Sequence, residues 1–336
     1  MRTIGFGDLA AHYRTMMQNA QMKADFARLG EELATGRVSD LKSATGSDLG
    51  NYSALETTLK RLAAFEISTT EAALFTESVQ FNLGHIQDLA SETAPNLLGA
   101  GNSYNALNIQ AQGNDARAKL ETIVSLLNAR VGDRTLLAGT GTDAPALVDA
   151  ETMMASLNAA VAGATTAGDV EAAVDAWFDT PGGTFETSIY TGTTDDLQPF
   201  RVGQNEIATL GLRADDAAIR DLLKGFAMAT VIADGALGVD NSERALAMQR
   251  AGEKMVTANG AFADLRARVG TIEAQIEKAA VRNSSEMTSL EIARANIVQV
   301  DPFETATELQ STEVQLETLY TITARLSRLN LVDFLR

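Results

Sequence analysis

The stretch that decides the fold runs from Asp301-Pro302-Phe303-Glu304 to Leu331-Val332-Asp333-Phe334-Leu335-Arg336. Asp followed by Pro is typical of a helix start, because the Asp side chain accepts from free amides and the fixed φ of Pro suits the first turn. Beyond it, apolar residues recur seven apart, in the pairs Leu309 and Leu316, Leu319 and Leu326, and Ile322 and Leu329. This period predicts a long helix that packs along its length against another helix.

A matching stripe lies near the other end of the chain. Steps of three and four residues connect Leu9, Tyr13, Met16, Ala20, Ala24 and Ala27. The pattern stops at Gly36, which suits a left-handed helix C-cap. We therefore expect the chain to fold back on itself, so that the row Leu9–Ala27 packs against the row Leu309–Leu329. Only one side of each helix is covered in such a pair, and we expect both ends to be mobile in the free monomer and to order on assembly.

Between the ends, the pattern is mostly helical. After a connector at 37–51, the sequence predicts a long helix that breaks near Ala94-Pro95, a third helix from about 103 to 131, and a helix from 242 to about 298. The last of these carries a 3-4 repeat in Met255, Ala258, Phe262, Leu265, Val269, Ile272 and Ile276. A strict seven-residue repeat over this length predicts coiled-coil packing.

The middle of the chain differs from both ends. Two short helices are expected near 149–162 and 168–178, short strands at 185–190, 201–202 and 207–212, and another helix from about 216. We predict a mainly α fold, a long antiparallel helical bundle or coiled coil formed by the N- and C-terminal regions, with a small α+β lobe inserted in the middle. The expected domains are 1–40 with 299–336 for assembly, 41–139 with 217–298 for the helical bundle, and 140–216 for the lobe.

Composition narrows the function. The chain has 336 residues, no cysteine and a formal net charge of −17. A disulfide framework or thiolate site is therefore excluded, and the charge argues against nucleic acid as a partner. No apolar run reaches the ~20 residues of a membrane helix, so membrane insertion is not expected. The first eight residues, MRTIGFGD, lack the apolar segment of a cleaved secretory signal peptide.

Candidate chemical sites are few. The two histidines, His12 and His85, have no partners at catalytic or metal-binding spacing. The acidic pairs Asp195-Asp196 and Asp215-Asp216 lie in a segment, Thr140 to Asp216, with 13 acidic and two basic residues, which is typical of a solvated surface. Gly139-Thr140-Gly141-Thr142 lacks the Lys of a phosphate loop and is interpreted as a turn. Trp177 and Phe178 are expected in the lobe core. We predict no enzyme activity, and no catalytic, cofactor or metal site.

Four stretches in this order carry a resemblance to a known family. They are the start Met1-Arg2-Thr3-Ile4, the segment Leu33–Arg37 with the Ser/Asp loop at 43–48, the segment Leu126–Ala129 with Leu136–Pro145, and the ending Leu326–Arg336. Together they resemble the bacterial flagellin superfamily, and within it the hook-associated proteins of the hook–filament junction. One departure is that Ala11-His12-Tyr13-Arg14 replaces the Asn-rich segment of filament flagellins.

The resemblance implies an extracellular structural protein of the bacterial flagellum, exported by the type III pathway without a cleaved signal peptide. It implies as partners copies of the same chain, neighbouring hook-associated protein and flagellin, and an export chaperone at the C-terminal region. A flagellin that forms the filament itself remains an alternative, and a self-contained α+β enzyme or ligand-binding protein is an alternative of another class. The residues expected in the assembly interface are Leu9, Tyr13, Met16, Ala20, Leu309, Leu316, Leu319, Ile322, Leu326 and Leu329.

Overall fold

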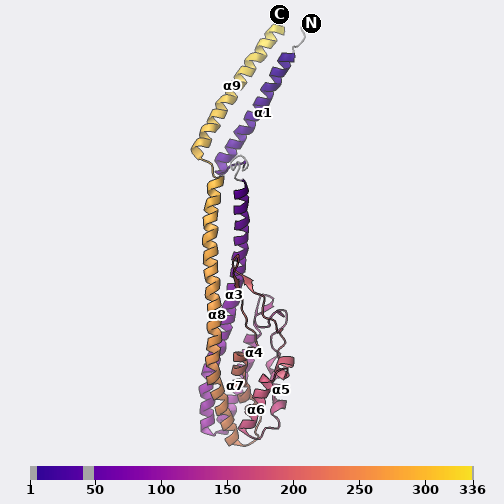
Figure 1. Ribbon diagram of the computed structural model, residues 1–336, viewed down its shortest axis with the longest axis vertical. Helices are drawn as coiled ribbons and strands as arrows, with labels where there is room; N and C mark the ends of the chain where they lie inside the picture. The colour runs from indigo at the N-terminus through magenta and orange to yellow at the C-terminus, as the bar shows by residue number, and fades with distance from the viewer. Residues whose placement is uncertain (1–5, 41–48, 335–336) are drawn as a thin grey trace. The chain divides into compact units, whose positions relative to one another are not determined.

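The computed structural model describes residues 6–40 and 49–334, and the side chains of these residues except 6–9, 11, 12 and 326–334. The described chain is mainly α-helical, with two short two-stranded sheets, which confirms the predicted fold class (Figure 1). Contacts divide it into two compact units, residues 1–62 with 285–336, called unit 1 here, and residues 63–284, called unit 2. The Ser/Asp loop expected at 43–48 lies outside the described residues.

Unit 1 contains the first and last helices of the chain. Helices α1 (Phe6–Thr35) and α9 (Pro302–Phe334) lie side by side and antiparallel (Figure 1). At the end of α1, Gly36 adopts the left-handed conformation with φ of +68°, as the sequence predicts. At the start of α9, the Oδ1 of Asp301 accepts from the amide of Phe303 at 2.8 Å and from that of Glu304 at 3.2 Å. Both predicted helix boundaries are confirmed.

The connectors next to α1 and α9 are joined by main-chain hydrogen bonds. Arg37 and Gln299 form an antiparallel β-bridge. The amide of Val38 donates to the carbonyl of Val298 at 2.9 Å, and the amide of Val300 donates to the carbonyl of Gly36 at 3.2 Å. Since a bridge of this kind fixes the register of two backbones, it sets where α1 and α9 begin their contact.

Unit 2 is built on two long helices, α3 (Leu49–Ser103) and α8 (Asn241–Val298), each of which also supplies residues to unit 1. Within unit 2 they run antiparallel, since Arg266 of α8 donates to Gln80 of α3, while Gln87 donates to Asn259. The 3-4 repeat predicted in α8 is buried, apart from the half-buried Ile272. Helices α4 (Ala106–Leu127) and α7 (Ala217–Ala233) pack against each other and complete the core.

Helix α3 continues through Pro95, so the predicted break at Ala94-Pro95 is wrong. A proline costs most where the carbonyl four residues earlier is left without a partner in a dry site. Here both Ser91 and Pro95 are exposed, so water can reach that carbonyl. Ala94 and Leu97 are buried on the opposite face, and their packing continues the helix beyond the proline.

The third helix is shorter than predicted at its C-terminal end. Helix α4 ends at Leu127, and the chain then forms a hairpin of strands β1 (Arg130–Val131) and β2 (Arg134–Thr135). The turn uses Gly132, whose φ is +58°, a conformation that glycine adopts without steric cost. Val131, at the end of the predicted helix range, therefore belongs to a strand.

The inserted segment contains helices α5 (Ala150–Val161) and α6 (Ala167–Asp179), close to the predicted ranges. Each has an N-cap in its sequence: Asp149 accepts from the amide of Thr152, and Thr166 with Asp169 forms a capping box. Trp177 and Phe178 are buried and make edge contacts with centroids 4.7 Å apart, which confirms their predicted place in the lobe core.

The strand predicted at 185–190 is wrong. Residues Phe185–Ile189 form a π-helical turn, η2. Phe185 and Ile189 are both buried, whereas Thr187 is exposed. A helical turn places residues four apart on one face, but a strand would place Thr187 on that face as well. The other predicted strands are confirmed in shorter form as β3 (Phe200–Arg201) and β4 (Ile207–Ala208), which pair antiparallel.

Candidate assembly surface

The contact between α1 and α9 contains few fully buried side chains. Leu29 of α1 and Leu316 and Thr305 of α9 are buried, while Leu309 and Leu319 are half-buried. Lys23 adds a cation–π contact, with its Nζ 5.6 Å from the ring centroid of Tyr320. A single row of this kind covers one side of each helix and leaves the other side open.

Large apolar side chains occupy the open sides of this pair. Tyr13 is 65% exposed, Met16 60% and Ile322 48%. Exposed apolar residues are ordinary when scattered, whereas a row along one element marks an interaction surface. The exposed apolar side chains of the two helices, called the terminal apolar surface here, are Tyr13, Met16 and Met17 in the first half of α1, Phe26 and Leu33 farther along it, and Phe303, Val314, Tyr320 and Ile322 of α9.

The residues predicted for assembly divide into three groups. Tyr13, Met16, Ala20 and Ile322 are exposed, so they are available to a neighbour. Leu309, Leu316 and Leu319 face the partner helix and contribute to the α1–α9 contact instead. The helices include the remaining three, Leu9, Leu326 and Leu329, whose side chains lie outside the description.

The search for apolar repeats did not identify Glu32 as a buried residue of the α1–α9 pair. Glu32 is buried, and its carboxylate accepts from the guanidinium of Arg28 and from the amide of Ser39, each at 3.0 Å. The amide bond ties the connector after α1 back to the helix. A search for apolar repeats passes over such a residue, although the i,i+4 spacing of Arg28 and Glu32 is a usable signal.

The other candidate residues have structural partners. Arg213 donates to Asp215 at 2.9 Å and also pairs with Asp196. Asp216 caps α7 by accepting from the amide of Ala218. The exposed side chain of His85 lies on α3, and that of His12 falls outside the described set. Within 6–40 and 49–334, no group of three or more His, Cys, Asp or Glu side chains is placed to hold a metal ion.

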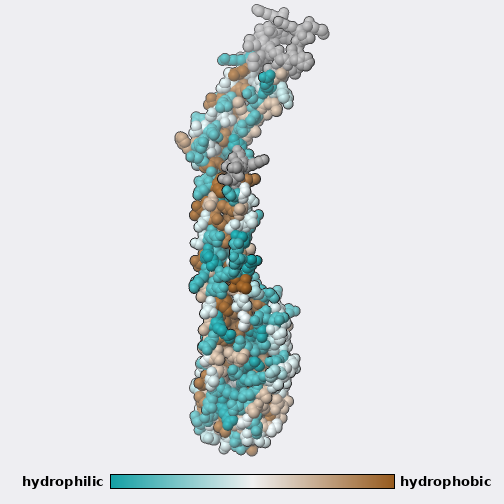
Figure 2. Space-filling view, in the orientation of Figure 1, coloured by the Kyte–Doolittle hydropathy of each residue, from teal (hydrophilic) through white to brown (hydrophobic). Residues whose placement is uncertain are grey.

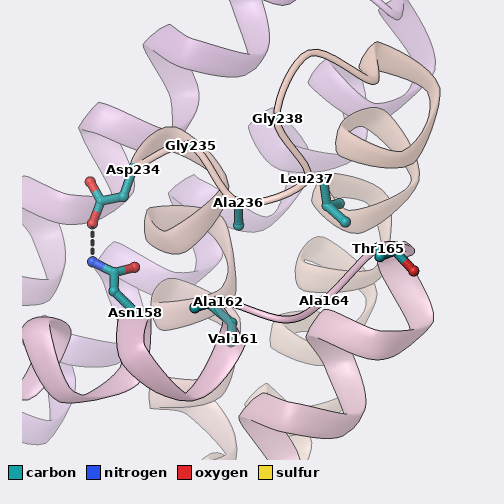
Figure 3. Close-up of a pocket in the computed structure, with 10 residues that line it drawn as sticks. All are labelled: Asn158, Val161, Ala162, Ala164, Thr165, Asp234, Gly235, Ala236, Leu237 and Gly238. Atoms are coloured by element: carbon teal, nitrogen blue, oxygen red, sulfur yellow. Dashed lines mark hydrogen bonds between the residues drawn. The ribbon is translucent and has the colours of Figure 1, made fainter.

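A groove of about 570 Å³ lies between the turn that follows α5 and the turn that follows α7. Figure 3 shows Asn158 and Asp234 pointing toward each other across it, joined by a hydrogen bond of 2.8 Å. Asp234 also pairs with Arg117, so the charged group in this groove is already neutralised. The other lining residues are small or aliphatic, apart from Thr165. The hydrogen bond between Asn158 and Asp234 joins the two turns.

A segment of the chain matches a known protein family. Residues 253–335, which include most of α8 and all of α9, match the model of the bacterial flagellin C-terminal helical region. Over these residues the chain is similar to the flagellin C-terminal helical region. The family resemblance found in the sequence is thereby confirmed for the segment that contains the α9 half of the terminal apolar surface. None of the described helices, in this flagellin region or elsewhere, is long and apolar enough to cross a membrane.

Comparison with solved structures finds similar chains of low identity. The FlgL crystal structure from Bacillus cereus is 13% identical, with a TM-score of 0.40, covering 74% of this chain and 97% of that one. A putative flagellar hook-associated protein from Vibrio parahaemolyticus is 12% identical, with a TM-score of 0.39, covering 73% and 92%. A comparison with curated protein sequences finds no match.

Proposed function

We propose that this chain is a structural subunit of the bacterial flagellum that assembles at the junction of hook and filament, as hook-associated protein 3 does. The observation that carries the proposal is the position of the flagellin C-terminal region. It ends in α9, which packs against α1 and leaves the terminal apolar surface open. Exposed apolar side chains along both terminal helices favour a chain that is completed by its neighbours.

Assembly from such a surface requires contacts between different faces of neighbouring copies. A heterologous contact whose rotation does not close gives an open helical array. The proposed division keeps 1–40 and 299–336 for assembly, 41–139 and 217–298 for the helical bundle, and 140–216 as an outer lobe. Figure 2 supports an outer position for the lobe, because the face of it that is shown is largely hydrophilic.

The proposed partners are other copies of the chain, a neighbouring hook-associated protein and flagellin. An export chaperone would bind the C-terminal region, where α9 presents Val314, Tyr320 and Ile322. Covering these side chains before export prevents premature assembly. The proposed route is flagellar type III export without a cleaved signal peptide, and the role is structural rather than enzymatic.

Immunogold labelling of intact flagella tests the location. The expected result is a short labelled band where the hook meets the filament. Label along the whole filament would instead identify the chain as a filament flagellin, and absence of label from flagella would reject both. A deletion strain separates the two roles, because loss of a junction protein leaves flagellin secreted into the medium, whereas loss of the filament subunit does not.

A further inference from the structure

A second apolar row lies on α3, in unit 2. Ile67, Leu74 and Phe81 are 71%, 53% and 72% exposed and follow one another at intervals of seven residues. They lie opposite the face that buries Ala72, Phe75, Val79 and Leu83. Residues 63–88 contain four acidic residues and no Lys or Arg, although Arg134 pairs with Glu71 and the Arg266 side chain lies against Gly84. This apolar face of α3 is called the α3 ridge here.

Helix α8 carries a row of the opposite kind. Gly260, Ala267, Ala274 and Val281 are exposed and also recur every seven residues, with Ala263 and Gly270 between them. Sets of four residues on such a helix bound the holes into which side chains of another helix fit. This face, called the α8 row here, offers three successive holes, bounded by 260, 263, 264 and 267, by 267, 270, 271 and 274, and by 274, 277, 278 and 281.

The packing of the chain itself gives no reason for glycine at position 260. A glycine inside a helix is less favourable than an alanine. Packing explains two other glycines. An added Cβ at Gly225 would lie 2.2 Å from Met255 Cγ, and one at Gly252 would lie 2.9 Å from Leu98 Cγ, so a larger residue does not fit at either position. At Gly260 no atom of the described chain lies within 4 Å of an added Cβ. The α8 row is therefore open to a side chain from outside.

We propose that the α3 ridge of one copy of the chain packs into the α8 row of a second copy. Three large side chains at seven-residue spacing match three holes at the same spacing, which is the condition for continuous knobs-into-holes contact. The charges also match. Residues 260–282 carry four Lys or Arg residues against three acidic ones, and Lys278 is exposed at the third hole, while Glu66 and Glu77 are exposed on α3 beside the ridge. Ion pairs within the chain already engage Arg268, Arg282 and Glu71.

The area of this contact indicates where it acts. From Ile67 to Phe81 a helix rises about 21 Å, and one such row buries less than the roughly 1,200 Å² of a stable independent interface. The contact is therefore weak between two free copies and becomes strong when other contacts hold the copies together. Since ridge and row are different surfaces, each added copy leaves one of each open. The contact does not involve the terminal apolar surface.

Site-directed crosslinking tests the proposal, because the native chain has no cysteine. Leu74 is the central knob and Thr271 bounds the central hole, so the two meet whether the helices run parallel or antiparallel. Full-length Leu74→Cys and Thr271→Cys proteins, one with a size tag, are mixed and treated with a short bismaleimide. The expected mixed product exceeds either self-product several-fold. It also exceeds the product of Thr271→Cys with Val239→Cys, a control at an isolated residue that is 96% exposed.

A second variant checks that the holes are needed. Ala267 is exposed and bounds two holes, so Ala267→Arg in the Thr271→Cys protein should lower the mixed product to the control level without changing the circular dichroism spectrum or the melting temperature. Two results would overturn the proposed contact between the α3 ridge and the α8 row. One is that Thr271→Cys crosslinks equally well to Leu74→Cys and to Val239→Cys, and the other is that the Leu74–Leu74 product dominates. Ile322→Asp in both partners removes the proposed terminal contact and should lower the yield, but the Leu74–Thr271 product should still exceed the Val239 control, which separates this contact from the proposed terminal assembly.

Discussion

The amide nitrogen of Val38 donates a hydrogen bond of 2.9 Å to the carbonyl oxygen of Val298. This bond joins the connector after α1 to the end of α8. Val38→Pro removes the donor, and we expect the α1–α9 pair to lose at least about 1 kcal/mol. Hydrogen exchange of amides in α1 and α9 should then be roughly five-fold faster. Gln299→Ala is the control, because it keeps both main-chain partners of the bridge, and equal effects of the two changes would contradict the prediction.

The terminal apolar surface gives a prediction for assembly. Tyr13→Asp and Ile322→Asp place a charge on exposed positions of α1 and α9, so each should prevent incorporation into flagella while leaving the monomer as stable as the parent. A charge buried in an interface costs several kcal/mol. Swimming in soft agar and electron microscopy of flagella measure the outcome. Val239→Asp, at an isolated exposed position, should swim normally, and normal swimming of the Ile322 variant would argue against this surface.

Two glycines should respond to alanine in opposite directions. Gly225→Ala places a methyl group 2.2 Å from Met255 Cγ and 3.1 Å from the Ala251 carbonyl, and overpacking of this kind costs about 1–3 kcal/mol. Gly260→Ala meets nothing in the described chain and should stabilise the helix by about 1 kcal/mol. Urea unfolding of the full chain gives both values. A stabilising Gly225→Ala would show that the core near Met255 is less tightly packed than the structure indicates.

The ion pairs between α6 and α8 predict a dependence of stability on pH. Partial burial opposes ionisation of Glu171, but hydrogen bonds and charge from Lys254 and Arg250 outweigh it and lower the pKa of this carboxyl. A lowered pKa stabilises the fold above the unfolded pKa, and that contribution is lost as pH falls through the folded pKa. Asp175 shares Lys254 at 2.9 Å, so part of the effect remains without Glu171.

Glu171→Gln tests this dependence. The variant should be less stable than the parent at pH 7, and the difference should shrink as the pH falls toward 3, because protonation of the Glu171 carboxyl removes the contribution of its charge. Urea unfolding at the two pH values measures the difference. Glu186→Gln serves as a control for removing an acidic charge elsewhere in the inserted segment, and its difference from the parent should change less with pH. A Glu171→Gln effect that is the same at both pH values would contradict the role of ionisation.

The division into units predicts the result of a truncation. Deleting residues 303–336 removes α9 but no part of residues 63–284, which form unit 2. We expect unit 2 to keep a single cooperative thermal transition, while the amides of α1 lose protection because their partner helix is absent. Loss of all cooperativity would show that unit 2 depends on the terminal helices.

Helix boundaries were predictable wherever the capping residue lies next to the boundary in the sequence. Asp301, Asp216 and Gly36 each act through their own backbone neighbours, so a short window of sequence contains the cause. The sequence predicted a break at Pro95, but the helix continues because water can reach the carbonyl of Ser91. That exposure depends on how α3 packs in the fold, which a short window of sequence does not show. Residues 185–190 were misread because alternation is visible in sequence, whereas the burial of both Phe185 and Ile189 comes from the helices around them.

The candidate surface was predictable in outline but not in detail. Heptad spacing identified α1 and α9 as partners, but it could not tell that Leu316 faces α1 while Ile322 remains exposed, because both belong to seven-residue pairs. The side on which a helix is covered depends on the partner's position. The α3 ridge was missed for the same reason: Ile67, Leu74 and Phe81 fall within an apolar helix, and only the structure separates its covered face from its open one.

The pairing of α1 with α9 also sets an order of folding. These are the first and last described helices, so their contact must close a loop that includes almost the whole chain. Closing a loop costs entropy that grows with the number of unfolded residues inside it. Folding of unit 2, with its antiparallel α3 and α8, shortens the effective loop before the pair forms. The terminal helices should therefore be the last elements to fold, after the core of unit 2 has formed.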